Sequence, residues 1–249
     1  MKLHKACTGL SSNIQLPLHL LLLLLFLLYV EVPAAAAAAN ISSPRCIERE
    51  RQALLIFKRS LVDDYGRLSS WGTQEDCCNW IGVHCSNRTT GHVLKLDLHA
   101  EYVFPHRPLR GKLSPPLLEL QHLTYLDLHN NDFGGNPIPG FIGSLSKLKH
   151  LHLSDANFGG NIPHQLGNLS NLHYLDLSSN YFSVESQLGY WLSHLSSLTY
   201  LDMSGVNLGS AFDWLHTIKS LPSLSVLRLI DCQLSESVKS PSPLSLINN

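Results

Sequence analysis

Histidine and cysteine are the side chains of this 249-residue chain that could bind a metal or act as a nucleophile or base. Fourteen histidines are present, and His99 with His129, or His150 with His152, would lie side by side on neighbouring strands or on one strand face. The sequence contains neither an H-E-x-x-H zinc motif nor a G-x-S-x-G nucleophile motif. We therefore expect surface histidines, with no catalytic residue, no metal site and no cofactor.

Four of the six cysteines, Cys46, Cys77, Cys78 and Cys85, form an even set in one short stretch. Such a set is typical of secreted domains with disulfides, and four cysteines allow three pairings. Adjacent cysteines rarely bond each other, so Cys77 and Cys78 are expected to find other partners. The most economical pairing joins Cys46 to Cys77 and Cys78 to Cys85, but the sequence alone leaves the connectivity open.

A structural zinc site is the alternative for these cysteines. The six residues between Cys78 and Cys85, and the lack of a second close pair, match no common zinc spacing. Cys232 stands apart from the set. We interpret it as a small buried residue rather than a reactive thiol or an intermolecular disulfide.

The first 39 residues have the composition of a secretory signal peptide. Two lysines precede an almost wholly apolar stretch at 16–30, and a run of alanines at 34–39 supplies small residues for a signal peptidase. A membrane anchor is the competing interpretation, but a spanning helix needs about 20 apolar residues. We predict that residues 1–39 are removed and that the mature chain has no membrane anchor.

Asn-x-Ser/Thr triplets at Asn40, Asn87 and Asn168 are candidate glycosylation sites and agree with passage through the secretory pathway. The predicted location is extracellular, at the outer face of the plasma membrane. The net charge is −1 and no block of like charge occurs, which argues against a nucleic-acid partner. None of the signature motifs of a protein kinase is present.

Residues 40–90 are predicted to form a cap. Between residues 46 and 61, apolar side chains recur at helical spacing: Ala53, Leu54, Phe57 and Leu61. The segment that follows contains Trp71 and Trp80 and is too short for a core of its own. We expect the helix, the tryptophans and two disulfides to make one compact unit.

Beyond residue 91 a single leucine pattern recurs. The chain contains 50 leucines, and the motif L-x-x-L-x-L, with occasional Val or Met, begins at residues 93, 123, 148, 172, 198 and 224. The resulting spacings of 24–30 residues lie in the range of leucine-rich repeats. One unit cannot bury its own leucines, so the units must stack. We predict an α/β leucine-rich-repeat solenoid, with a curved parallel sheet on its concave face, about six repeats in residues 91–249 and a disulfide-stapled helical N-terminal cap.

The ninth position of each unit should hold a small polar side chain that bonds main-chain groups of the turn. Asn131, Asn180 and Cys232 are suitable residues, whereas Glu101 and Ala156 depart from the pattern, as does Val206. A missing side chain leaves main-chain groups to other partners. We therefore expect looser turns at the three departures.

Outward strand positions form two columns of candidate ligand contacts on the concave face. The candidates are Lys95, Tyr125, Asp127, His150, His152, Tyr174, Asp176, Tyr200, Asp202 and Arg228. Tyrosine beside acid suits a polar protein or peptide ligand. The alternative is that the acids serve only solubility. Because imidazoles charge near pH 6, we expect ligand binding to be acid-sensitive.

The cap and the repeats resemble the extracellular region of plant leucine-rich-repeat receptors. The resemblance rests on C-x-x-x-E-R-x-A-L-L-x-F-K at 46–58, L-S-S-W at 68–71 and C-C-x-W-x-G-V-x-C at 77–85. The segment 158–169 is similar to the plant repeat L-x-G-x-I-P-x-x-L-G-x-L, which in that family adds a second strand. Details at 62–68, 118–123 and 136–143 look most like the receptor-like proteins that include the ethylene-inducing xylanase receptors.

The resemblance implies a recognition module without enzymatic activity. It would bind an extracellular protein or peptide in defence, and would signal through a receptor kinase as co-receptor. The alternative is a secreted inhibitor or decoy that acts on an extracellular hydrolase. Because residues 240–249 contain no paired-cysteine C-terminal cap, we expect a truncated array whose last coil exposes its leucine face.

Overall fold

The computed structural model describes residues 46–86, 90–102, 106–183 and 188–234. The predicted signal peptide, Asn40 and Asn87 lie outside these residues. All of the described residues belong to one compact unit that spans 43–249. None of the helices in this part of the chain is long and apolar enough to cross a membrane.

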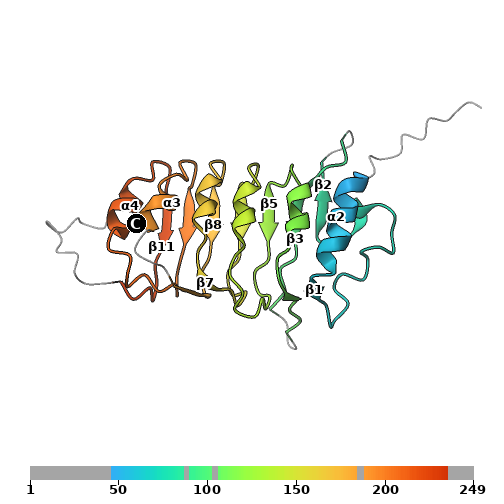
Figure 1. Ribbon diagram of the computed structural model, residues 1–249, viewed down its shortest axis with the longest axis horizontal. Coiled ribbons are helices and arrows are strands. Elements are labelled where there is room, and N and C mark those ends of the chain that lie inside the picture. Colours follow the sequence, from blue (N-terminus) through green and yellow to red (C-terminus); the bar gives the residue numbers. More distant parts are fainter. Residues whose placement is uncertain (1–45, 87–89, 103–105, 184–187, 235–249) are drawn as a thin grey trace, which may run out of the picture. The chain divides into compact units, whose positions relative to one another are not determined.

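Seven short strands form one sheet, and six of them run parallel (Figure 1). They lie in chain order as β2 (Val83–Cys85), β3 (Val93–Asp97), β5 (Tyr125–Asp127), β6 (His150–His152), β8 (Tyr174–Asp176), β10 (Tyr200–Asp202) and β11 (Val226–Arg228). Equivalent residues of successive coils pair in register, so that Leu126 faces Leu151 and Tyr125 faces His150. The predicted repeat architecture with a parallel sheet is confirmed.

The inward strand residues form the core that the leucine pattern predicts. Residues without exposed surface in five successive coils are Leu96, Leu126, Leu151, Leu175 and Leu201. Burying one leucine side chain contributes about 2 kcal/mol, so the stack gains stability with every coil. In β11, at the edge of the sheet, Leu227 is 37% exposed, as expected for the last coil.

The segments that return from one strand to the next change along the chain. The earlier coils use the 3₁₀ helices η2 (Pro115–Glu119), η3 (Gly140–Ser144) and η4 (His164–Asn168), and the later coils use α3 (Leu188–Leu192) and α4 (Trp214–Lys219). A second parallel sheet pairs β7 (Gly159–Asn161) with β9 (Tyr181–Ser183). These are the additional strands that the resemblance implied.

The cap helix is shorter than its apolar pattern predicted. Helix α2 (Glu48–Lys58) ends before Leu61, which lies instead in β1 (Leu61–Val62). Strand β1 pairs antiparallel with β4 (Arg110–Gly111), a segment far along the chain. Local periodicity contains no information about that pairing, and the expectation of a helix over 46–61 is therefore wrong at its C-terminal end. The buried stripe of the helix is Ala53, Leu54 and Phe57.

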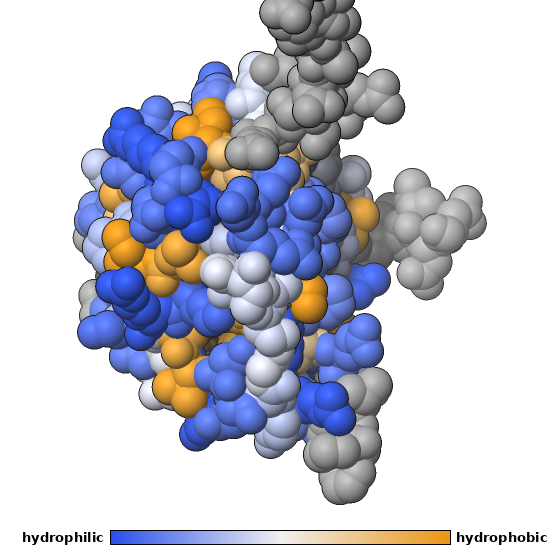
Figure 2. Space-filling model, turned by 90° about the vertical axis from the view of Figure 1, so that its right-hand side faces the viewer, coloured by the Kyte–Doolittle hydropathy of each residue, from blue (hydrophilic) through white to orange (hydrophobic). Residues whose placement is uncertain are grey.

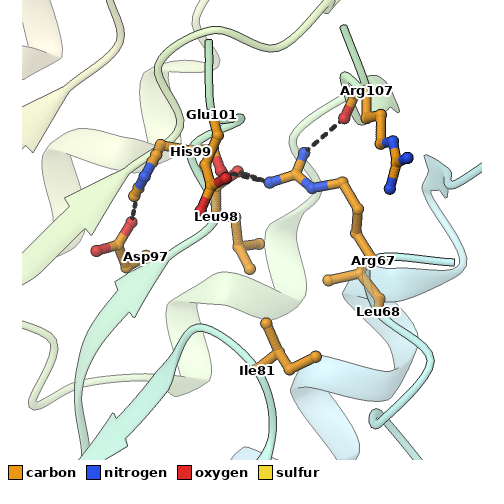
Figure 3. Close-up of a pocket in the computed structure, with 8 residues that line it drawn as sticks. All are labelled: Arg67, Leu68, Ile81, Asp97, Leu98, His99, Glu101 and Arg107. Atoms are coloured by element: carbon orange, nitrogen blue, oxygen red, sulfur yellow. Dashed lines mark hydrogen bonds and ion pairs between the residues drawn. The ribbon is translucent and has the colours of Figure 1, made fainter. Parts of the chain in front are cut away.

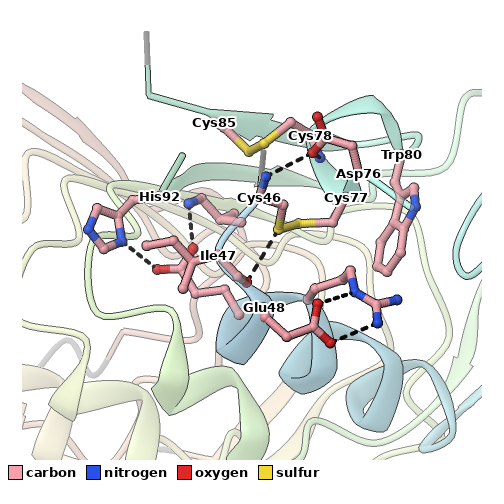
Figure 4. The surroundings of a disulfide bond; sticks show 12 residues. Cys46, Ile47, Glu48, Asp76, Cys77, Cys78, Trp80, Cys85 and His92 are labelled. Carbon is pink, nitrogen blue, oxygen red and sulfur yellow. Dashed lines mark hydrogen bonds and ion pairs between the residues drawn. A yellow bond between two sulfur atoms is a disulfide. The ribbon is translucent and has the colours of Figure 1, made fainter. Parts of the chain in front are cut away.

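Two disulfides close the cap, one from Cys46 to Cys77 and one from Cys78 to Cys85 (Figure 4). This is the pairing that the spacing favoured. A carboxylate oxygen of Asp76 accepts hydrogen bonds from the main-chain N–H groups of Cys46 and Cys78, at 2.9 and 3.0 Å. One aspartate thus connects the two disulfides.

Two tryptophans form the interior of the cap. The rings of Trp71 and Trp80 stack with their centroids 5.5 Å apart, and both residues are buried. The 3₁₀ helix η1 (Cys77–Asn79) leads directly into Trp80.

Viewed from the cap end, the surface is mostly hydrophilic, with small and separate hydrophobic areas (Figure 2). Exposed apolar residues of the cap include Ile56 and Ile81.

The cap and the repeats share one sheet, although the sequence placed a domain boundary at residue 90. Strand β2 of the cap pairs antiparallel with β3 of the first repeat. The carboxylate of Glu50, a helix residue that is 3% exposed, accepts a hydrogen bond of 2.6 Å from the main-chain N–H of Val93 and lies 2.8 Å from Nδ1 of His92. The cap helix is therefore tied to the first strand by a buried carboxylate.

Asparagine side chains connect neighbouring coils. The amide nitrogen of Asn180 donates to the carbonyl oxygens of Leu153 in the preceding coil and Leu177 in its own coil, at 2.7 and 3.1 Å. Its amide oxygen accepts from the N–H of Phe158 at 2.9 Å. Asn131 makes the equivalent contacts two coils earlier, where its amide nitrogen donates to the carbonyl oxygens of Leu98 and Leu128 and its amide oxygen accepts from the N–H of Leu109. The thiol of Cys232 lies 3.1 Å from the carbonyl oxygen of Met203.

Two of the expected gaps in this ladder are closed by other groups. At the Glu101 coil, the guanidinium of Arg67, which belongs to the cap, donates to the carbonyl oxygens of Leu98 and His99. At the Ala156 coil, the main-chain carbonyl of Ala156 accepts from the N–H of Phe133 at 2.9 Å. Other partners therefore take up main-chain groups at these two positions, as the sequence led us to expect, and the expectation of looser turns stays a prediction.

Glu50 allows a test of the joint between cap and repeats. Replacing Glu50 by Ala leaves the buried N–H of Val93 without its acceptor, and we expect a loss of about 2–3 kcal/mol in the free energy of unfolding. The matched control is Glu48→Ala, which removes an exposed carboxylate of the same helix. Denaturant titrations of both variants give the comparison. Equal losses in the two variants would contradict a special role for the buried carboxylate.

Candidate ligand-binding surface

A continuous stack of side chains runs across the outward face of the sheet. Its members, one from each strand from β3 onward, are Lys95, Tyr125, His150, Tyr174, Tyr200 and Arg228. The four rings follow one another at centroid distances of 4.1–4.3 Å. A cation covers each end, with Nζ of Lys95 4.1 Å from one ring centroid and the guanidinium carbon of Arg228 5.8 Å from another. The in-register pairing of the strands thus places rigid aromatic surface along this column.

The acids beside this column are engaged within the protein. Asp127, Asp176 and Asp202 are buried. Each accepts a hydrogen bond of 2.9–3.3 Å from the tyrosine hydroxyl of its own strand, contributed by Tyr125, Tyr174 and Tyr200. Each also accepts from the main-chain N–H two residues further on, which belongs to His129, Ser178 and Ser204. The acids therefore orient the tyrosine hydroxyls and bind the main-chain N–H groups at the strand ends. A role in solubility alone, which was the alternative for these acids, does not account for these hydrogen bonds.

Histidines gather at the end of this surface nearest the cap. The rings of His99 and His129 stack at 4.7 Å, and those of His129 and His152 at 4.2 Å. Nδ1 of His99 lies 2.5 Å from a carboxylate oxygen of Asp97. The two oxygens of Asp127 lie 2.7 Å from Nδ1 of His129 and 3.3 Å from Nδ1 of His152. Three imidazoles and two carboxylates thus form one connected cluster.

The histidines of strand β6 have different proton affinities. Burial lowers the pKa of His150 to about 4, so this ring is neutral at physiological pH. The expectation that the histidines charge near pH 6 is therefore wrong for His150. Burial also disfavours the charged form of His152, but the hydrogen bond to Asp127 and the nearby carboxylates raise its pKa above the usual value. Of these two histidines, His152 is therefore the one that can make ligand binding acid-sensitive.

The side chain of Arg67 was not identified from the sequence. It lies beside a cavity of about 370 Å³ at the junction of the cap and the first coil, where Asp97, His99 and Glu101 also contribute to the lining (Figure 3). The guanidinium donates to Oδ1 of Asn131 at 2.8 Å, in addition to the main-chain carbonyls of the first turn. Because the segment around Arg67 has no repeat register, no sequence pattern indicated this contact.

The structure places all ten candidate ligand contacts on the main sheet, in the two predicted columns. Among the predicted glycosylation sites, Asn168 lies within the described residues and is exposed at the end of η4. The thiol of Cys232 is buried, and burial raises its pKa. Glycosylation of Asn168 remains a prediction.

Comparison with known families matches the cap and three of the coils. A leucine rich repeat N-terminal domain model matches residues 47–86, and a Leucine Rich Repeat model matches 122–145, 147–169 and 171–195. Two tomato (Solanum lycopersicum) proteins, receptor-like proteins EIX1 and EIX2, are 44% and 46% identical over 80% and 82% of the chain. Over most of its length the chain is similar to plant leucine-rich-repeat receptor-like proteins. It spans about 20% of the length of each of these two relatives.

Solved structures of this kind share the fold. The ectodomain of the Arabidopsis receptor kinase HAESA, in complex with an IDA peptide hormone ligand, superposes with a TM-score of 0.57 at 25% identity. The match covers 75% of this chain and 33% of the HAESA chain. Both matched family models describe repeat or cap domains rather than catalytic domains. The described coils thus share their fold with the ectodomain of a receptor kinase that was solved with a peptide hormone.

Asp97 provides a pH-dependent test of the surface. Burial alone would raise its pKa, but hydrogen bonds from His99 and Lys95 outweigh burial and lower it. A depressed pKa means that the ionised form stabilises the fold above the unfolded pKa of about 4, and that this stability is lost as pH falls through the folded value. We expect Asp97→Asn to cost about 1 kcal/mol near neutral pH and less below pH 4.

The control for this measurement is Asp64→Asn, which removes the exposed partner of Arg110. Its effect on thermal stability should be smaller at neutral pH, because a more exposed pair is better screened by water. Thermal unfolding followed by circular dichroism from pH 3 to pH 7 compares both variants with the wild type. A loss in Asp97→Asn that is constant over this range would contradict the assigned ion pairing.

Proposed function

We propose that the described repeats are part of the extracellular recognition region of a receptor-like protein, and that they bind a protein or peptide ligand in plant defence. The observation that carries the proposal is the aromatic stack on the outward face of the main sheet. Tyrosine rings held by their neighbours lose little freedom on binding, and tyrosine is enriched among the residues that dominate interface energies.

The relatives support the same function. Receptor-like proteins are the class to which the two tomato relatives belong, and the HAESA ectodomain binds a peptide hormone on the same fold. We extend the proposal to the location and the partner: the chain acts at the outer face of the plasma membrane and signals with a receptor kinase as co-receptor. No nucleic acid takes part in this function.

A binding assay with an ethylene-inducing xylanase tests the proposal, because the receptor-like proteins that the chain resembles include receptors for such a protein. The full chain is immobilised, and the xylanase is titrated over it in biolayer interferometry. We expect wild-type binding and about a 30-fold weaker affinity for Tyr174→Ala, which corresponds to ~2 kcal/mol for an interface hot spot.

Tyr181→Ala is the matched control, since Tyr181 is 76% exposed but belongs to β9 of the second sheet. Its affinity should equal that of the wild type. Equal weakening by Tyr174→Ala and Tyr181→Ala, or no xylanase binding at all, would contradict the proposal. The xylanase activity is measured in the same mixtures, and its loss on binding would favour a secreted inhibitor over a receptor.

A further inference from the structure

Strand β6 differs from the other strands of the sheet at both of its outward positions. Strands β5, β8 and β10 all read Tyr-Leu-Asp, whereas β6 reads His150-Leu151-His152. Because outward residues alternate with inward ones, both imidazoles lie on the outward face. Strand β6 lies between β5 and β8 (Figure 1), and its register places His152 opposite Asp127.

Asp127, His150 and His152 form a compact set of metal-ligating groups. One ligand atom from each of the three lies within 4.8 Å of the other two. Oδ2 of Asp127 and Nδ1 of His152 are 3.3 Å apart. That separation is close to the one expected for two neighbouring ligand atoms that each lie about 2.0–2.1 Å from a tetrahedral zinc ion.

His150 has a nitrogen available for an ion. Within the described part of the chain, its Nε2 is buried and has no hydrogen-bond partner. A buried polar atom without a partner costs free energy unless something binds it. The ring is fixed between Tyr125 and Tyr174, at centroid distances of 4.1 Å on both sides.

The other two groups are oriented by surrounding polar atoms. Nε2 of His152 lies 2.7 Å from the hydroxyl of Ser154, and its Nδ1 faces Oδ2 of Asp127, so that an ion would take the place of the proton between these two atoms. Asp127 accepts from the hydroxyl of Tyr125 at 2.9 Å and from the N–H of His129 at 3.1 Å. Partners of this kind fix the orientation of the ligating atoms and strengthen metal binding.

We propose that Asp127, His150 and His152 bind a divalent transition-metal ion on the outward face of the sheet. Two imidazoles and one carboxylate suit zinc and its neighbours in the first transition row better than magnesium or calcium, which prefer oxygen ligands. Three protein ligands leave one position of a tetrahedral ion open to water or to a group of a bound partner. The site is independent of the proposed function, because the metal alone tests it.

A second set of groups shares Asp127 but is less suited to an ion. His99, Asp127 and His129 also bring their ligand atoms within 4.8 Å of one another. There, Nδ1 of His99 and Nδ1 of His129 are both hydrogen-bonded to carboxylates, at 2.5 and 2.7 Å. His150 makes no such bond, so the set on β6 is favoured.

Isothermal titration of zinc into the full chain, carrying no polyhistidine tag, tests the site near neutral pH. We expect one equivalent to bind with high affinity. His150→Tyr should weaken that affinity at least tenfold, since it removes a ligating nitrogen. The variant should fold, because tyrosine stands at the equivalent position of the adjacent strands β5 and β8.

His173→Gln serves as the matched control, because His173 is an exposed histidine whose Nδ1 lies 2.7 Å from the carbonyl oxygen of Asn171. It should bind zinc as the wild type does. His99→Gln should also change the affinity by less than about threefold. If His150→Tyr does not fold in circular dichroism, His152→Asn replaces it, with the same expected loss.

Substitution with cobalt gives an independent measurement. A cobalt ion held by two imidazoles and a carboxylate shows visible absorption bands, and these should disappear in His150→Tyr and persist in His99→Gln. Three results would overturn the proposal: no zinc binding by the wild type, unchanged affinity in His150→Tyr, or a loss in His99→Gln that exceeds the loss in His150→Tyr.

Discussion

Burial of the strand leucines by neighbouring coils is the interaction on which the rest of the structure depends. Most strands of the main sheet contain only three residues, and a strand of that length cannot bury a side chain by itself. When Leu126, Leu151 and Leu175 align in register, the residues on either side of each leucine align as well. Every outward position therefore becomes a straight column. The aromatic stack and the row of acids are direct consequences of packing on the opposite face.

The cap takes the place of a preceding coil for the first coil of the array, whose strand would otherwise lack a partner on that side. It supplies a strand, a carboxylate and a guanidinium in place of that coil. Strand β2 pairs with β3, Glu50 accepts from the first strand, and Arg67 takes the place of the missing ladder asparagine. These groups come from three separate segments of the cap. The two disulfides connect the start of the cap helix to Cys77 and the adjacent Cys78 to strand β2, which helps a short domain to act as a template for a sheet.

One coil interrupts a regular electrostatic pattern without interrupting the packing. The ring of His150 continues the stack between two tyrosines, and His152 occupies a position that is aspartate in the neighbouring strands. The core of this coil is unchanged, since Leu151 is fully buried. The change therefore concerns only the outward face. It converts a row of acids bonded to tyrosines into a mixed cluster of imidazoles and carboxylates, which has a different chemistry while the leucine core remains buried.

The sequence by itself determined the repeat, the positions of its strands, the buried leucines and the family resemblance, because each of these follows from a pattern of fixed period or spacing. It also favoured the observed disulfides and placed the candidate columns on one face. Only the tertiary structure decided where the cap helix ends, that Arg67 enters the first turn and that Ala156 needs no asparagine. The same holds for the engagement of Asp127 and the low proton affinity of His150. Each of these features depends on contacts between groups that are distant in the chain, or on burial. Local periodicity in the sequence reveals neither such contacts nor the burial of a polar group.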